Sequence, residues 1–306
     1  MSADPVSLPI TKIGEYAVCA AVNALSAEMI LPQSFRPVVL LPPGTEEADL
    51  RRIMDQIGRT CASLQLSIEG GHTEVTPAVT RPVVIGCCTG VPMDRCKCAD
   101  APMDVADCNG GAEHPGDAGL LAGSKEPDHP ADSAAHIVMT KWAGMEGTCL
   151  LAQEKEELRD RFPETLLSRM RMLDTLLCVR DEAIICAREG AAYLTDLSDG
   201  GFYAALHRLS KKAKRGFRVD LSSVPILQET IEFSNHYDID PYTMRSMGSL
   251  LVVTRDAETL IARLGESGIP AVRIGELSRD RDKILLLGEE KRFLDLPQPD
   301  ALLKVL

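Results

Sequence analysis

The chain has 306 residues, of which 45% are hydrophobic and 25% charged, an ordinary composition for a globular protein long enough to form two domains. Its 33 Lys and Arg against 45 Asp and Glu give a net charge of −12, which argues against non-specific binding to nucleic acid or to anionic membranes. No apolar run reaches about 18 residues and the N-terminus lacks a secretory pattern, so we expect no membrane span and a cytoplasmic setting in which the ten cysteines stay reduced.

The first ninety residues alternate between predicted helices and predicted strands. An Ala-rich stretch over residues 12–29 and a longer amphipathic stretch over residues 44–64 indicate two helices. Apolar runs over residues 35–43, near 66–70 and over 81–87 indicate strands. This alternation favours a mixed α/β domain.

Two adjacent glycines, Gly70 and Gly71, stand directly before the polar residues His72 and Thr73. Glycine has no Cβ, so the backbone there can turn sharply or approach a ligand closely. The polar residues beyond the turn are therefore either ordinary loop residues or a site for an anion. A carboxylate such as Asp4, together with this imidazole and hydroxyl, could hold a hydrated Mg²⁺ against nucleotide phosphates. The spacing in the sequence does not show whether these groups meet.

The pattern of helices and strands breaks down over residues 91–135. Between Asp94 and Asp132 there are nine acidic and three basic residues, a net of −6, with nine Gly or Pro. Such a segment cannot bury enough apolar surface to offset its ordering entropy, so we expect a mobile insertion or linker.

Cysteines and histidines gather in and just before this insertion. Their spacing is adjacent or one apart, whereas structural zinc sites usually have two to four intervening residues, so a Cys-containing loop is favoured over zinc or redox chemistry. The residues are Cys87, Cys88, Cys96, Cys98, Cys108, His114 and His129.

Order returns at residue 136, and the remaining chain again alternates strands with helices. The predicted strands cover residues 136–144, 191–196, 216–221, 248–254, 270–277 and 283–288. The predicted helices cover residues 148–162, 163–177, 180–190, 201–213, 227–237 and 256–268. The whole pattern favours an α/β or α+β architecture in two lobes.

A second pair of glycines, Gly200 and Gly201, lies between a predicted strand and a helix. Backbone N–H groups at a helix N-terminus attract phosphate or carboxylate groups. An ordinary turn with Asp199 as the helix cap is the alternative. On the same helix we interpret His207 as a surface or packed residue, and the basic run over residues 211–218 as a solvated helix end.

Several segments, in this order, resemble the AIR (aminoimidazole ribonucleotide) synthase superfamily. "ADPVSLP", "IGEYAVCAAVNALSAE", "VVLLPPGTEEADLRRIM" and "GGHTEVTPAVTRPVV" look like its N-terminal half. "MTKWAGMEGTCLLA", "LTDLSDGGFYAALHRL", "IDPYTMRSMGSLLVV" and "AVRIGEL" look like its C-terminal half. The sequence is most similar to AIR-synthase-related proteins near the hydrogenase-maturation carbamoyl dehydratases, and the resemblance covers the chain except the insertion.

This resemblance implies a two-domain AIR-synthase-like fold. It implies an N-terminal sheet-plus-helices domain over residues 1–90, which forms a homodimer through its sheet, and a C-terminal α/β domain over residues 136–306, separated by the insertion at 91–135. ATP with Mg²⁺ would lie between the sheet and the dimer partner, and the shared chemistry would be phosphorylation of an amide-type or related oxygen. The substrate, a small molecule or a protein undergoing maturation, is not identified, and neither is a catalytic residue.

The resemblance also implies roles for particular residues. Asp4 and Glu74 would bind the metal. The cofactor would be bound by Asn23, Gly70, Gly71, His72 and Thr73. The substrate would be bound by Asp196, Gly200 and Gly201.

The sequence also departs from the family pattern. Relatives carry a Gly-rich segment with an Asp-Ala-Ala motif before the residue that matches Asp4, and this sequence starts where that segment should end. Either the segment has been lost, or the true start of the protein lies upstream of Met1. Ala24 replaces an Asp, and His72 stands where most members have Asp. The carbamoyl dehydratases end in a reactive cysteine, whereas this sequence ends "ALLKVL". The resemblance therefore favours an ATP-dependent enzyme and leaves open a catalytically degenerate relative, a pseudoenzyme with a binding or regulatory role.

Overall fold

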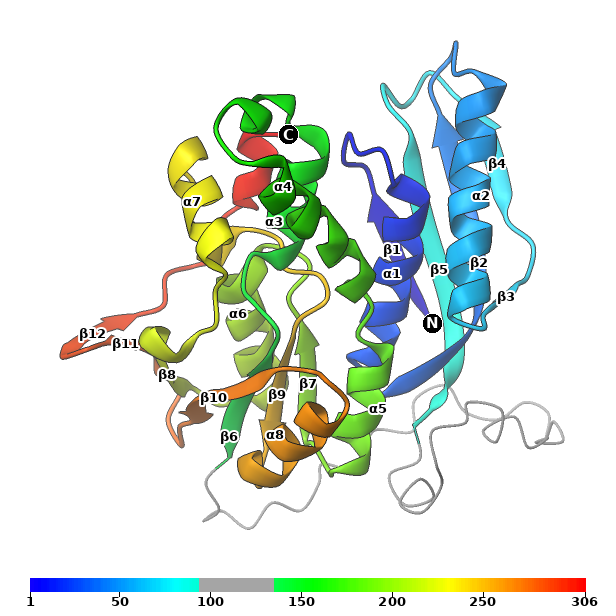
Figure 1. Cartoon of the computed structure of the whole chain (residues 1–306). Coiled ribbons are helices and arrows are strands. Elements are labelled where there is room, and N and C mark those ends of the chain that lie inside the picture. Colours follow the sequence, from blue (N-terminus) through cyan, green and yellow to red (C-terminus); the bar gives the residue numbers. More distant parts are fainter. Residues whose placement is uncertain (94–134) are drawn as a thin grey trace, which may run out of the picture.

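The computed structural model describes residues 1–93 and 135–306, which form two β-sheets with helices packed on them (Figure 1). The first sheet has the order β1-β5-β2-β3, with β4 also paired to β2. Its strands are β1 (Ser2–Val6), β2 (Ile30–Leu41), β3 (Ser67–Ile68), β4 (His72–Val75) and β5 (Val83–Pro92). The helices α1 (Ile13–Ser26) and α2 (Glu47–Ser63) pack on one face of this sheet. No described element covers the other face.

The second sheet has seven strands in the order β12-β11-β8-β10-β6-β9-β7. Its strands are β6 (His136–Thr140), β7 (Tyr193–Asp196), β8 (Phe217–Asp220), β9 (Leu250–Thr254), β10 (Ala271–Leu277), β11 (Lys283–Leu287) and β12 (Glu290–Phe293). The helices are α3 (Met145–Glu154), α4 (Glu164–Arg171), α5 (Arg180–Arg188), α6 (Gly201–Ala213), α7 (Gln228–Tyr237) and α8 (Ala257–Glu266). The predicted mixed α/β architecture is thus confirmed, and no helix in the described part of the chain is long and apolar enough to cross a bilayer.

The first glycine pair allows the edge of the first sheet to change register. Strands β3 and β4 both run parallel to β2, with Ile68 opposite Phe35 and His72 opposite Val38. Between these two pairs the edge strands advance by four residues while β2 advances by three. The edge therefore contains one extra residue, which is a bulge. Gly70 has a φ of 79°, and a Cβ on Gly71 would lie 2.7 Å from the carbonyl oxygen of Pro37. The positive φ explains the glycine at position 70, and the close approach to Pro37 explains the glycine at position 71.

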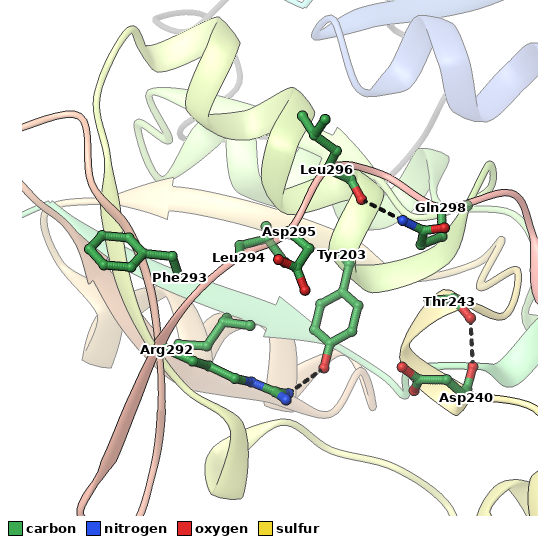
Figure 2. A pocket seen from close by; sticks show the side chains of 11 residues that line it. Tyr203, Asp240, Thr243, Arg292, Phe293, Leu294, Asp295, Leu296 and Gln298 are labelled. Atoms are coloured by element: carbon green, nitrogen blue, oxygen red, sulfur yellow. Dashed lines mark hydrogen bonds between the residues drawn. The ribbon is translucent and has the colours of Figure 1, made fainter.

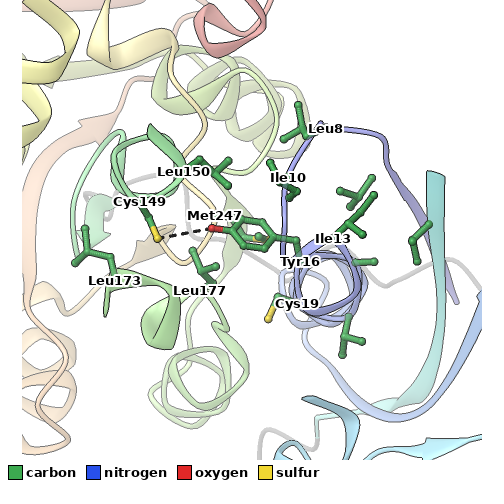
Figure 3. Close-up of a cluster of buried hydrophobic side chains, with 14 of the residues drawn as sticks. Leu8, Ile10, Ile13, Tyr16, Cys19, Cys149, Leu150, Leu173, Leu177 and Met247 are labelled. Carbon is green, nitrogen blue, oxygen red and sulfur yellow. Dashed lines mark hydrogen bonds between the residues drawn. The ribbon is translucent and has the colours of Figure 1, made fainter. Parts of the chain in front are cut away.

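The two halves share one hydrophobic core, which joins α1 to α3. Ile13 and Tyr16 of α1 pack in the same buried cluster as Cys149 and Leu150 of α3. Figure 3 shows Tyr16 pointing at Cys149, with its hydroxyl donating to Sγ at 3.7 Å. This shared core brings the edge strand β1 of the first sheet toward the edge strand β7 of the second.

Candidate acidic site between the two sheets

Asp4 lies on β1 with its side chain on the face covered by α1. It pairs with Gly86 of β5, and a Cβ on Gly86 would meet the carbonyl oxygen of Ala17 and the Cβ of Ala21 in α1. Directly paired residues share a face, so Asp4 points to the same side. Its Oδ2 atom is buried and has no hydrogen-bond partner among the described residues.

The carboxylate of Asp4 lies in a field of like charge. Burial, followed by the charges of Asp196 and Asp199, raises the pKa of Asp4 from 3.8 to about 6. The structure therefore brings together Asp4 and Asp196, which the sequence placed in separate domains. No three His, Cys, Asp or Glu side chains within residues 1–93 and 135–306 are arranged as a complete ligand set for a metal ion.

The turn that follows Asp196 carries the second glycine pair into α6. Gly200 has a φ of 68° and is the N-cap residue of α6, so the prediction that Asp199 caps this helix is wrong. A Cβ on Gly201 would lie 2.4 Å from the carbonyl oxygen of Met244, so packing alone requires glycine there. Arg208 of α6 holds the turn by donating to the carbonyl oxygens of Asp196 and Asp199, at 2.9 and 2.8 Å.

Arg245 is a site residue that the sequence analysis did not single out. Its guanidinium donates to Asp199 Oδ1 and to Glu146 Oε1, both at 2.9 Å, and lies 3.7 Å from Asp300. Burial raises the pKa of the fully buried Glu146, and Arg245 opposes that rise. For Arg245, burial acts to lower the pKa, but its acidic neighbours, Glu146 first, raise it overall. No motif in the sequence points to this network, because its members come from four separate segments.

His72 and Glu74 do not lie near Asp4 within one chain. They occupy β4, at the opposite edge of the sheet, about three strand spacings or roughly 14 Å away. His72 pairs with Val38, whose side chain is on the uncovered face, and its Nε2 lies 3.5 Å from Glu74 Oε2. A single chain therefore cannot supply Asp4 and Glu74 to one metal ion, and this part of the prediction is corrected. Thr73, the other polar residue of the stretch, is exposed on the same edge strand.

Asn23 has a structural use that leaves no polar atom of its side chain for a cofactor. It is fully buried on α1. Its Nδ2 donates to the carbonyl oxygen of Leu177 at 2.7 Å, and its Oδ1 accepts from the backbone N–H of Val179 at 2.9 Å. Both partners belong to the second half of the chain. The expected role in cofactor binding is replaced by a role in joining the two halves.

A pocket of about 300 Å³ lies beside the same glycine turn (Figure 2). Gly200 lines it, together with Tyr203 of α6 and Arg292 of β12. Arg292 donates to the hydroxyl of Tyr203 at 3.0 Å, and the ring of Tyr203 stacks on that of Tyr242. The pocket therefore offers a guanidinium and an aromatic wall to a small molecule.

The described cysteines do not form a metal site. Cys87 and Cys88 are neighbours on β5, so their side chains point to opposite faces and cannot chelate one ion. The residues Cys96, Cys98, Cys108, His114 and His129 lie outside the described part of the chain. Burial raises the pKa of Cys149 to about 12, so this thiol stays protonated.

A family model described as "AIR synthase related protein, C-terminal domain" matches residues 135–287, which is half of the chain. The chain belongs to the AIR synthase related family. A relative, the carbamoyl dehydratase HypE of Rhodobacter capsulatus, is 26% identical over 258 residues, which cover 84% of this chain and 66% of the relative.

Solved structures agree with this AIR-synthase-like fold. A HypE–HypF complex has a TM-score of 0.72 at 17% identity, covering 97% of this chain and 90% of that one. HypE in complex with ATP has a TM-score of 0.69 at 18% identity, covering 98% of this chain and 86% of that one. These TM-scores and coverages establish the shared two-domain fold.

Proposed function

We propose that this protein is an ATP- and Mg²⁺-dependent enzyme whose site lies between β1 and the turn that enters α6. The main observation behind the proposal is the half-buried carboxylate of Asp4, whose buried Oδ2 has no described hydrogen-bond partner and which lies near the charges of Asp196 and Asp199. Such an arrangement is costly without a cation and becomes favourable with one. A solved HypE of the same fold binds ATP, which supports a nucleotide as the phosphate source.

The donor set suits Mg²⁺ better than a metal enclosed by protein ligands. Magnesium is usually held by one or two carboxylates, with water and substrate phosphates completing the shell. Asp4 and Asp196 would supply the carboxylates. When bound, Mg-ATP would supply a phosphoryl group that turns an amide-type oxygen of the substrate into a leaving group.

The surrounding residues would orient the phosphates and the substrate. The first backbone N–H groups of α6, beginning at Gly201, and the positive end of the helix dipole favour an anion there. Arg245 would hold Asp199 away from the phosphates through their hydrogen bond. The pocket beside Gly200 and Arg292 would take the substrate.

The residues on β4 would contribute only in a dimer. The uncovered face of the first sheet carries half-buried apolar residues such as Val38 and Ile85, which suits the homodimer expected from the family. In that dimer His72 and Glu74 would face the partner chain, whereas Thr73, which pairs with the core residue Val39, points to the other face. Light scattering of the wild type and of Ile85→Glu tests this, because a charge on that face would give monomers.

Calorimetry with Mg-ATP tests the proposed site. We expect Asp4→Asn and Asp196→Asn to weaken binding by about tenfold or more, because each removes a charge that faces the cation. Asp55→Asn, an exposed change on α2, is the matched control and should bind like the wild type. A folded wild type that binds no Mg-ATP, or an Asp4→Asn variant with unchanged affinity, would refute the proposal. Binding without turnover would favour the degenerate, regulatory alternative.

A further inference from the structure

A basic groove of about 680 Å³ runs along α6 on the surface of the second half. Its cationic lining residues come from α6, from the turn that follows it, and from the turn before β11 and the first residue of that strand. They are Arg208, Lys211, Lys214, Arg215, Arg281 and Lys283. None of the residues that line the groove in the described chain is acidic, although the whole protein has a net charge of −12.

The helix dipole alone does not account for this concentration of charge. Lysines in the last turn of a helix are favoured by the negative end of the dipole, which explains Lys211. It does not explain Arg281 and Lys283, which lie outside the helix and line the same groove. Two separate parts of the chain therefore direct cations into one concave space.

The printed hydrogen bonds of Arg208, Arg215 and Lys283 go to carbonyl oxygens and an imidazole nitrogen, so none of them is to a carboxylate. Arg208 donates to two backbone carbonyls, and Arg215 Nε donates to the carbonyl oxygen of Ser278 at 2.9 Å. Lys283 Nζ lies 3.0 Å from Nδ1 of His207, whose Nε2 donates to the carbonyl oxygen of Asp295. Because Nε2 donates to that carbonyl oxygen, Nδ1 accepts from the ammonium of Lys283.

We propose that this groove binds a small molecule bearing two or more phosphate groups, at a site separate from the acidic one. Guanidinium and ammonium groups, which line this groove, are the side chains that proteins use to bind phosphates. The volume falls within the range of pockets for small ligands and exceeds what one inorganic phosphate needs. Lys211 and Arg281 are both exposed and form no ion pair with any described residue, so they are available to such a ligand.

Calorimetric titration with inorganic tripolyphosphate in the presence of a chelator tests this proposal. Without a divalent cation the acidic site repels the probe, so binding reports the groove and does not depend on the proposed Mg-ATP site. We expect the wild type to bind, and Lys211→Glu and Arg281→Glu each to weaken binding by about tenfold, with a larger loss in the double variant. Arg59→Glu makes the same charge change on the exposed face of α2 and should leave the affinity within about twofold.

The outcomes separate a built site from general attraction. Loss of binding in the groove variants, with unchanged melting temperatures and an unaffected Arg59→Glu control, supports the groove. Absence of binding to the wild type, or an equal loss in the control, overturns it. If Mg-ATP binding also persists in the groove variants, the two sites are independent.

Discussion

The carboxylate of Asp4 is held where its ionisation is unfavourable. It combines burial, an oxygen without a hydrogen-bond partner and two neighbouring acids on the turn before α6. A neutral amide of the same shape would lose the repulsion and keep the packing. The ionisation of Asp4 should therefore make both the stability of the protein and its affinity for a cation depend on pH.

We predict that Asp4→Asn stabilises the metal-free protein near neutral pH. The folded pKa of Asp4 is about 6 against an ordinary 3.8, so the folded chain binds this proton more tightly than the unfolded chain. The resulting stability is complete below about pH 4 and is lost as the pH rises through about 6. Asparagine does not titrate, so the stability of the variant relative to the wild type should grow over this range.

Urea denaturation in the presence of a chelator, at several pH values between about 4 and 8, measures this difference. The same series for Gly58→Ala, which changes no ionisable group, should give a difference that does not change with pH. A stability difference for Asp4→Asn that is also flat with pH would show that the carboxylate is not perturbed. Adding Mg²⁺ near neutral pH should stabilise the wild type more than the variant.

At the scale of elements, the close packing of α1 on β5 sets the position of β1. Gly86 lies at this contact, where a Cβ would be 2.6 Å from the carbonyl oxygen of Ala17 and 2.8 Å from the ring of Phe35. The same residue is the pairing partner of Asp4. Any displacement of α1 is therefore transmitted to the carboxylate.

We predict that Gly86→Ala destabilises the protein by about 1–3 kcal/mol, because overpacking forces the helix away from the sheet. Gly58→Ala is the control: no atom lies within 4 Å of a Cβ built at this glycine of α2. It should stabilise the helix by about 0.5–1 kcal/mol, since alanine has the higher helix propensity. Thermal melting of both variants checks the contrast, and equal effects of the two changes would contradict the packing argument.

The elements that the sequence predicted correctly are those with a clear apolar period. Helices α1, α2 and α6 and strands β6 and β9 have such a pattern and were located to within a few residues. Strands β1, β4 and β12 were missed because they are short, polar or exposed, and only pairing with a neighbour makes them strands. The two strands predicted near the end of the chain are not adjacent, since β8 lies between them.

The family resemblance named Asp4 for metal binding and Asp196 for substrate binding, and these roles stay predictions, whereas register decides which face His72 occupies. Asp4 and Asp196 were both proposed, and they do lie near each other. The face on which His72 points follows from the bulge at Gly70, which shifts the register by one residue and so selects the face. Arg245 had no local motif to reveal it.

At the scale of the whole molecule, the two halves behave as one body because a buried amide and a shared core join them. Asn23 bonds backbone groups on both sides of Cys178, and Lys212 of α6 donates to the carbonyl oxygen of Ala27 and to Glu28. We expect these contacts to couple the unfolding of the first sheet to that of the second.

We predict that Asn23→Leu destabilises the protein by about 2–5 kcal/mol, because it leaves the carbonyl of Leu177 and the N–H of Val179 buried without partners. Ser26→Ala is the control on the same helix, since its buried hydroxyl has no described partner and its loss should cost little. Denaturant titration measures both changes. A loss of Mg-ATP affinity in a folded Asn23→Leu variant, with stability unchanged, would instead restore the cofactor role.

Helix α6 places opposite charges at its two ends. Its first turn adjoins the carboxylates of Asp4 and Asp196, and its last turn borders the basic groove, over about 20 Å of helix. A highly charged anion that diffuses toward this side of the protein is attracted to the basic groove at the last turn of α6. The carboxylates at the first turn repel the same anion until a cation is bound there. The encounter rate should therefore fall as ionic strength rises, even if the final affinity at the acidic end is set by the cation.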